Sequence, residues 1–170
     1  MVLNMNFNNI TNRIKSINPN IKFVGQFDEN NKRTGRWEYY RANGKILEKG
    51  NYVNGFKHGY WVRYFSNGKH TWKGNFINGN REGYFEFYWD NGIIQEKGRY
   101  LNGKRDGYWE DYYSNGNIES KGNFINGNRE GYWEYYWNNN VIRKKGKYHN
   151  DMKQSIWPNY DRNGEFEGFS

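Results

Sequence analysis

Cysteine is absent from the 170 residues of this sequence. Without it the chain can form neither a disulfide framework nor a thiolate metal site. Long apolar runs are absent too: no stretch of about 18 apolar residues could span a bilayer, and the N-terminal MVLNMNFNNITNRIKSIN lacks the apolar segment of a signal peptide. We therefore expect a soluble protein located in the cytoplasm, with peripheral attachment to a membrane as an alternative.

Aliphatic residues are scarce and the mean hydropathy is -1.26, yet 21% of the residues are aromatic, with 8 Trp and 16 Tyr. Disordered chains are poor in aromatic residues, so this composition predicts a folded domain with a core of rings. The net charge of +8 favours acidic partners in general. What this charge does depends on where the cations lie.

A short repeat runs through the chain. The segment KGNFINGNREGY occurs twice, 48 residues apart, and a key glycine recurs every 24 residues. This glycine is found at Gly35, Gly59, Gly83, Gly107 and Gly131. Most repeats also contain two Asn-Gly pairs, as at Asn43-Gly44 and Asn54-Gly55. Asn-Gly between β-forming residues is a strong hairpin signal, so each repeat is predicted to supply two antiparallel strands.

The charges predict a register for these strands. If Asn43-Gly44 is a two-residue loop, residues whose numbers sum to 87 face each other, so that Trp37 faces Gly50 and Glu38 faces Lys49. The same rule pairs three later glutamates with lysines, as Glu86–Lys97, Glu110–Lys121 and Glu134–Lys145. Opposite charges across strands favour a register by a few tenths to about 1 kcal/mol each.

The predicted strands carry aromatic residues on both faces. Because side chains alternate along a strand, Trp37 and Tyr52 share one face while Tyr40 and Lys49 share the other. No helical segment within the repeats could cover either face. We therefore predict an all-β fold: an elongated, single-layer antiparallel β-meander of about six 24-residue units, roughly twelve strands, over residues 19–170.

Both ends of such a sheet need protection from further strand pairing. Within residues 1–18, Phe7, Ile10, Ile14 and Ile17 recur at helical spacing, which predicts a short N-terminal capping helix. Pro158 removes a backbone donor near the C-terminal end, as edge strands tolerate.

The units resemble repeats of the MORN family. GRWEYYRANGKILEKGNYVNG, for example, fits the variant in which G-x-W-x-x-Y-x-x-N-G is followed by K-G-x-Y-x-N-G, and the resemblance extends from Gly25 to about Gly168. It implies an elongated β-meander that serves as a scaffold, a protein-binding surface or a membrane-proximal module; bacterial members of the variant are also labelled antitoxin-like. The pattern is broken at Phe85, Asn139-Asn140, Asp151 and Ser155, so we expect the last repeat to deviate in geometry.

Catalysis needs a unique constellation of side chains, and these repeats are nearly uniform. The sequence contains no cysteine nucleophile, no HExxH motif and no glycine-rich phosphate loop. We interpret His58, His70 and His149, which lie in separate repeats, as solvent-exposed residues rather than metal ligands or bases. We therefore predict a non-enzymatic protein with no cofactor, no metal site and no small-molecule substrate.

Cations recur in two rows. In the first, Lys49, Lys97, Lys121 and Lys145 face glutamates, whereas Lys73 faces Val62 and is left free. The second row follows the other turn and is unbroken: Arg33, Lys57, Arg81, Arg105, Arg129 and Lys153. We interpret this second row as a solvated positive stripe and as the candidate site for an acidic partner or an anionic lipid. Nucleic acid is less favoured, because no nucleic-acid-binding motif is present.

Rings at the invariant positions, such as Trp37 and Tyr40, are interpreted as packing between neighbouring repeats. Four and six residues after the key glycine the residue type varies, and there the central repeats carry extra rings. These are our candidate protein-binding residues: Phe87, Trp89, Tyr113, Tyr135 and Trp137. Exposed aromatic patches usually mark interfaces.

The sequence thus favours a non-enzymatic repeat scaffold that binds a protein partner, or its own copy, through an extended aromatic surface. Peripheral binding to an anionic phospholipid membrane through the second basic row is the first alternative. An antitoxin-like binding role is the second, and it follows from the family resemblance alone.

Overall fold

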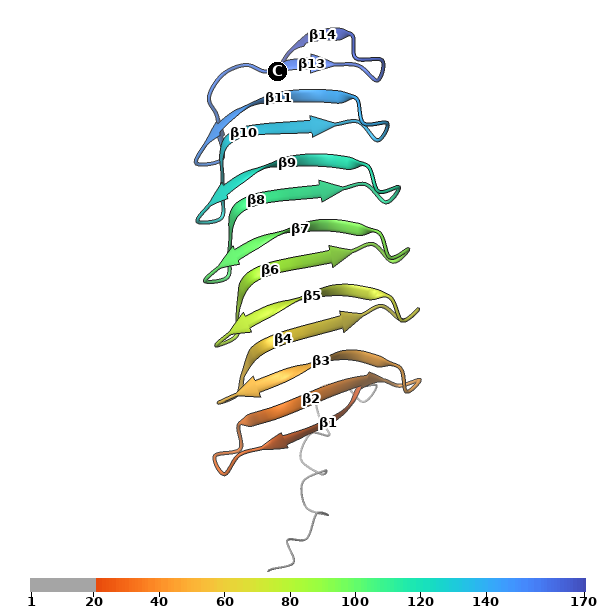
Figure 1. Cartoon of the computed structure of the whole chain (residues 1–170), viewed down its shortest axis with the longest axis vertical. Helices are drawn as coiled ribbons and strands as arrows, with labels where there is room; N and C mark the ends of the chain where they lie inside the picture. The colour runs from red at the N-terminus through yellow and green to blue at the C-terminus, as the bar shows by residue number, and fades with distance from the viewer. Residues whose placement is uncertain (1–20) are drawn as a thin grey trace, which may run out of the picture.

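A computed structural model describes residues 21–170, which form one antiparallel sheet of 14 strands stacked along the long axis of the molecule (Figure 1). The strands follow one another in chain order, except that the short β12 pairs with β11 beside the main path. Residues 21–170 contain strands and turns and no helix. The predicted elongated meander is therefore confirmed, whereas the capping helix expected within residues 1–18 lies outside the described residues.

The strands from β1 to β11 have similar lengths, and the last three are shorter. Their bounds are β1 (Ile21–Phe27), β2 (Arg33–Arg41), β3 (Ile46–Val53), β4 (Phe56–Tyr64), β5 (His70–Ile77), β6 (Asn80–Tyr88), β7 (Ile94–Leu101), β8 (Lys104–Tyr112), β9 (Ile118–Ile125), β10 (Asn128–Tyr136), β11 (Ile142–His149), β12 (Met152–Lys153), β13 (Pro158–Tyr160) and β14 (Phe166–Phe169). Two strands arise from each 24-residue repeat, as predicted.

Two kinds of turn alternate along the sheet. At Asn54-Gly55 both residues have positive φ, 52° and 86°, and Val53 pairs directly with Phe56, which is the predicted two-residue hairpin. At Asn43-Gly44 only Gly44 has positive φ, and the amide of Arg41 donates to the carbonyl of Lys45 at 2.9 Å. This loop therefore has three residues, and the two-residue loop expected there is wrong.

The predicted register is nevertheless confirmed. Trp37 pairs with Gly50 and Glu38 with Lys49, and the three later Glu–Lys pairings recur at the expected positions. A bulge near the turn explains why the predicted register holds although the loop is longer than expected. Tyr39 pairs with Glu48 whereas Tyr40 pairs with Ile46, so β3 has one extra residue between these two pairs. The extra residue in β3 compensates for the extra residue in the loop.

A second bulge explains the key glycine of the repeat. The pairing of β3 with β4 runs from Lys49–Val62 to Asn51–His58, so β4 contains two more residues than β3 in this interval. Gly59 lies in the bulge with a φ of 70°, a conformation that residues with a side chain rarely adopt. The glycine therefore recurs every repeat because the bulge does.

Each large ring on one face lies over a glycine of the preceding repeat. A Cβ atom built on Gly98 would lie 2.3 Å from Cδ2 of Trp109, and one on Gly50 would lie 2.2 Å from Cδ2 of Trp61. Trp61 and Trp109 are fully buried. In the register Trp109 also faces Gly122 of its own hairpin, as predicted for Trp37 and Gly50. The ring itself lies over Gly98 of the preceding repeat and so joins two repeats.

The last repeat deviates, as expected. Only the pair Lys144–Asn159 joins β11 to β13, and β12 has two residues. The indole nitrogen of Trp133 donates to the carbonyl of Asn123 at 3.1 Å, but that of Trp157 is buried without a hydrogen-bond partner in the described part of the chain. The sheet is therefore partly open between β11 and β13.

Candidate interaction surfaces

One face of the sheet, here called the ring face, carries the core. Its buried rings form two rows across the repeats: Trp37, Trp61, Phe85, Trp109, Trp133 and Trp157, and Tyr52, Phe76, Tyr100, Phe124 and Tyr148. Neighbouring rings meet edge to face, as for Tyr100 and Trp109, whose centroids are 5.0 Å apart. Such contacts are favourable for aromatic pairs, so the core runs continuously from repeat to repeat.

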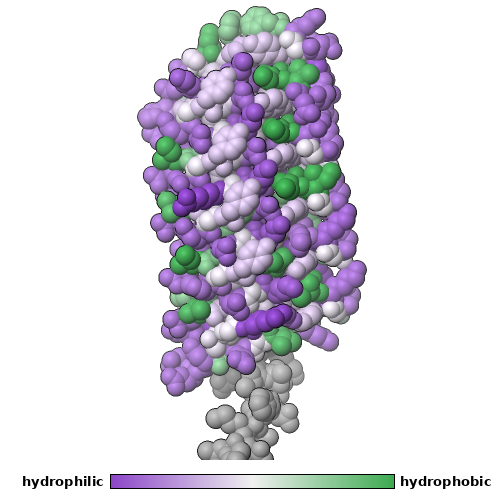
Figure 2. Space-filling view, viewed as in Figure 1, coloured by the Kyte–Doolittle hydropathy of each residue, from purple (hydrophilic) through white to green (hydrophobic). Residues whose placement is uncertain are grey.

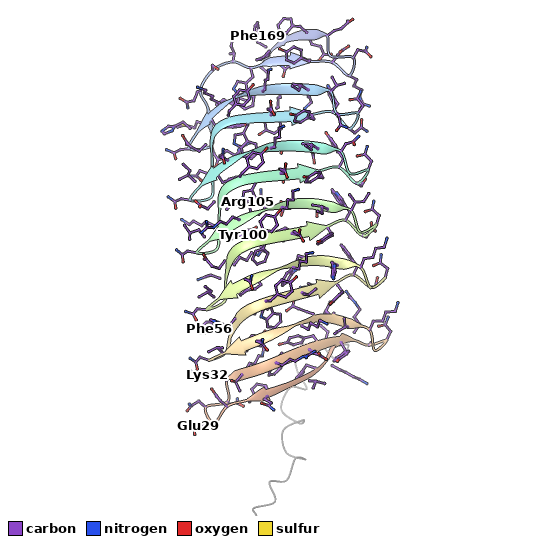
Figure 3. All side chains as sticks on the ribbon, viewed as in Figure 1. Glu29, Lys32, Phe56, Tyr100, Arg105 and Phe169 are labelled. Atoms are coloured by element: carbon purple, nitrogen blue, oxygen red, sulfur yellow. The ribbon has the colours of Figure 1, made fainter. Side chains whose placement is uncertain are left out.

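The second basic row also lies on the ring face. The guanidinium carbon of Arg105 is 4.3 Å from the ring centroid of Trp109, and Arg105 forms an ion pair with Glu96. Figure 3 labels Arg105 and Tyr100 on the neighbouring strands β8 and β7, where the two residues pair in the register. Each such contact contributes about 0.5 to 2 kcal/mol. The cations thus cover the rings of a sheet that has no second layer.

Burial separates the members of this row. Arg33, Lys57, Arg81, Arg105 and Arg129 are half-buried, and Lys153 is exposed. The description as a solvated stripe therefore fails for five of the six. Arg129, for example, donates to Tyr148 Oη at 2.9 Å and pairs with Asp151 at 2.8 Å. Whether the row binds an acidic partner or a lipid stays a prediction.

The five predicted protein-binding residues have two different environments. Phe87 and Tyr135 are half-buried and pack against the core. The other three, Trp89, Tyr113 and Trp137, are half-buried near the three-residue turns and donate to carbonyls of the next repeat, those of Tyr112, Tyr136 and Tyr160, at 2.9, 2.7 and 2.9 Å. These three residues therefore tie repeats together. Binding by any of the five stays a prediction.

The opposite face, here called the outer face, carries a row of tyrosines that the sequence argument missed. Tyr60, Tyr84, Tyr108 and Tyr132 immediately precede the core rings, so they point away from them, and they are 53%, 54%, 51% and 47% exposed. A tyrosine buries about 150–250 Å² when covered, so each leaves about 100 Å² of ring exposed. Figure 2 shows weakly hydrophilic side chains stacked in a column along this face.

A second exposed row flanks the tyrosines near the two-residue turns. It consists of Val53, Ile77, Leu101 and Ile125, all more than a third exposed. These residues alternate with the core residues of the same strands, so they also belong to the outer face. Exposed apolar area of several hundred Å² is unusual for a monomer and typically marks an interaction site.

Ion pairs stand beside the tyrosine row. Lys73 lies 2.6 Å from Glu86, Lys97 lies 2.9 Å from Glu110, and Lys121 lies 3.0 Å from Glu134. Lys73 is therefore not free, contrary to the sequence argument. The register explains this, because Glu86 faces Lys97 on one side and Lys73 on the other. The charges of these three lysines on the outer face are thus paired.

The model of the MORN repeat variant matches residues 33–54, 81–102 and 105–126. The chain is a MORN-repeat protein. Repeats of this family often act as modules that bind proteins or membranes. No curated protein matches the sequence. Each matched segment includes both strands that flank a three-residue turn. The segments contain Tyr84 and Tyr108 of the tyrosine row and the ion pair Lys97–Glu110.

Glutamates on the two faces of the MORN repeats have opposite pKa shifts. Burial opposes the ionisation of Glu86, but hydrogen bonds from Lys73 and Tyr88 and the lysine charges outweigh it and lower its pKa. On the ring face, burial raises the pKa of Glu96; Arg105 opposes the change, and the facing Asp111 adds to it. The charged form of Glu86 is therefore stabilised by folding, and that of Glu96 is disfavoured.

These pKa shifts predict that replacing glutamate by glutamine changes stability in opposite directions at the two positions. At pH 7, E86Q should lower the free energy of unfolding by about 1 kcal/mol, and E96Q should raise it by a few tenths to about 1 kcal/mol. The contribution of Glu86 is present above the unfolded pKa and is lost as the pH falls through the lowered folded pKa. The free-energy cost of ionising Glu96 in the folded protein is present above its raised folded pKa. This cost disappears as the pH falls through that pKa to below the ordinary pKa of a glutamate. Urea unfolding from pH 7 to acid checks both signs; a loss with both variants at pH 7 would contradict the assignment.

The described MORN repeats offer no metal site. Within residues 21–170 no group of three or more His, Asp and Glu side chains could hold an ion. His58, His70 and His149 are all exposed. No helix among the described residues is long and apolar enough to cross a membrane.

Proposed function

We propose that this protein is a scaffold that binds a protein partner through its outer face. The observation that carries the proposal is the column of half-exposed tyrosines, Tyr60, Tyr84, Tyr108 and Tyr132, with the aliphatic row beside it. No other element of residues 21–170 covers this face, because the sheet has one layer. The MORN family, whose repeats often act as interaction modules, is consistent with such a role.

The chemistry of the outer face suits a protein better than a membrane. Tyrosine combines a large apolar ring with a hydrogen-bonding tip, and it is enriched where proteins bind each other. Three lysines of this face, Lys73, Lys97 and Lys121, are engaged by glutamates and are therefore less available to anionic lipid. Membrane attachment through the second basic row is less favoured, since five of its six cations are half-buried over rings.

Site-specific photocrosslinking tests the proposal. p-Benzoylphenylalanine placed at Tyr108 on the outer face should capture a partner in cells, whereas the same group at Phe87 on the ring face should not. Both positions carry an aromatic ring on the central strands β8 and β6, which makes the two probes comparable. Equal capture from both positions, or capture from Phe87 alone, would overturn the assignment of the face.

A loss-of-binding variant completes the test. Y84S/Y108S/Y132S should abolish co-purification of the partner that the crosslinking identifies. Stability should change by less than about 1 kcal/mol, because the three rings are about half exposed. S66A/S114A, which changes two exposed serines in the three-residue turns and none in the tyrosine column, is the matched control and should retain the partner. Size-exclusion chromatography with light scattering shows whether the partner is a second copy of the chain.

A further inference from the structure

The end of the sheet carries a cavity of about 510 Å³ that is open to solvent and lies beside β11, β13 and β14. Its lining includes Trp137, Arg143, Lys144, Tyr160, Glu167 and Phe169. Cavities of a few hundred Å³ lined by rings and a few polar groups are typical of small-molecule sites. The cavity lies where β11 and β13 share a single pair.

The walls of the cavity are fixed by hydrogen bonds. The indole nitrogen of Trp137 donates to the carbonyl of Tyr160 at 2.9 Å. The amide and carbonyl of Ser170 each bond with those of Trp157 at 2.9 Å, which holds the end of β14 in place. Figure 3 labels Phe169 on this last strand, and its ring is 64% exposed. The aromatic wall is therefore both positioned and accessible.

The cations of the cavity are peculiar to this repeat. The positions of Arg143 and Lys144 are occupied in the other copies by Leu47-Glu48, Thr71-Trp72, Gln95-Glu96 and Glu119-Ser120. Two adjacent cations thus replace neutral or acidic residues at one place in the array. A structural requirement of the repeat does not explain them, because the other copies form the same strand without them.

These cations lack acidic partners. Neither Arg143 nor Lys144 takes part in an ion pair among residues 21–170, and Nε of Arg143 is buried without a hydrogen-bond partner there. Burial lowers the pKa of Lys144, and the charges of Lys153, Arg143 and Arg129 lower it further. Glu167 supplies one negative charge to the lining. Two cationic side chains thus stand against one acidic side chain in the lining.

We propose that this cavity binds an aryl phosphate, with the phosphate at Arg143 and Lys144 and the aromatic ring against Phe169. A doubly charged anion would satisfy both cations, and the arginine fork and lysine ammonium are the usual phosphate donors. The ring of Trp137 is already contacted by the guanidinium groups of Arg143 and Arg162, each 5.3 Å from its centroid. Phe169 is 64% exposed, whereas Tyr160 is half-buried, so Phe169 is the ring that we assign to stacking with the ligand.

Calorimetric titration of the full chain tests this site with phenyl phosphate as the probe. R143Q/K144S introduces the residues of sister repeats, Gln95 and Ser120, so the strand should form normally. We expect this variant to bind phenyl phosphate about tenfold more weakly or worse. The control K22Q/K104Q removes the same charge at two exposed lysines and should bind within about twofold of the wild type. An equal loss in both variants, or no binding to the wild type, overturns the proposal.

Further probes separate the parts of the ligand. Inorganic phosphate and benzoate should each bind more weakly than phenyl phosphate. Equal affinity for inorganic phosphate would overturn the requirement for an aromatic ring, and equal affinity for benzoate would overturn the requirement for a dianion. F169S should weaken phenyl phosphate but leave inorganic phosphate unchanged, which provides a second test should R143Q/K144S misfold. A phosphotyrosine peptide that binds more tightly than phenyl phosphate would identify a peptide as the source of the group; weaker binding would identify a free small molecule.

Discussion

Replacing Gly98 by alanine should lower the free energy of unfolding by about 3 kcal/mol or more. The new Cβ would lie 2.3 and 2.4 Å from Cδ2 and Cε2 of Trp109, far inside van der Waals contact. The indole cannot retreat, because it is fully buried, Tyr100 packs edge-on at 5.0 Å, and Arg105 covers its other side at 4.3 Å. Urea unfolding followed by tryptophan fluorescence measures the change.

Two controls isolate the cause of this loss. R99A changes the next residue, whose exposed side chain points to the outer face, and should cost less than about 0.5 kcal/mol. In a W109L background, G98A should cost much less than in the wild type, since the two sites then no longer clash. Additive losses in G98A, W109L and the double variant would show that the contact with the ring is not the cause.

The repeat and the register could be predicted because they follow from local rules. The spacing of glycines and Asn-Gly pairs predicted two strands per repeat, although roughly twelve strands were expected and the sheet has 14. Charge pairing such as Glu38–Lys49 predicted the register. The three-residue loop at Asn43-Gly44 escaped prediction, since Asn-Gly fits two kinds of turn. The bulge in β3 then hid the error, because it restored the pairing from Tyr39 onwards.

The roles of the two faces were harder to predict. Alternation from Trp109 places Arg105 on the ring face and Tyr108 on the outer face, so the signal for both was present in the sequence. What alternation does not reveal is which face is covered. In a single-layer sheet the cover comes from side chains of the same strands, and the row of cations over rings became evident only from the contacts.

The pairing of Lys73 illustrates a related limit. Within its own hairpin Lys73 faces Val62, and the sequence of one hairpin shows no more than this pairing. Every inner strand of a meander has two neighbours, and in the second pairing Lys73 faces Glu86. Rings obey the same rule, since Trp109 pairs with Gly122 in its own hairpin but lies over Gly98 of the preceding one. Contacts between neighbouring hairpins can therefore not be predicted from a single repeat.

Because of these contacts, the effect of removing a buried ring depends on where the ring lies in the array. W109A should cost about 3–5 kcal/mol, because it empties a fully buried site between two repeats and removes the hydrogen bond to the carbonyl of Arg99. In a repeat array each unit contacts only its neighbours, so a central break should uncouple the two halves. Urea unfolding of W109A should therefore show two transitions where the wild type shows one.

W157A provides the matched comparison at the end of the array. Trp157 is as buried as Trp109, but its ring packs on Tyr148 and Tyr135 of the preceding repeat and its indole nitrogen has no hydrogen-bond partner among residues 21–170. We expect a smaller loss, a single main transition, and faster hydrogen exchange confined to β13 and β14. In W109A the faster exchange should instead extend across β7 to β10. Equal losses and identical exchange patterns would show that the sheet folds as one unit rather than as coupled repeats.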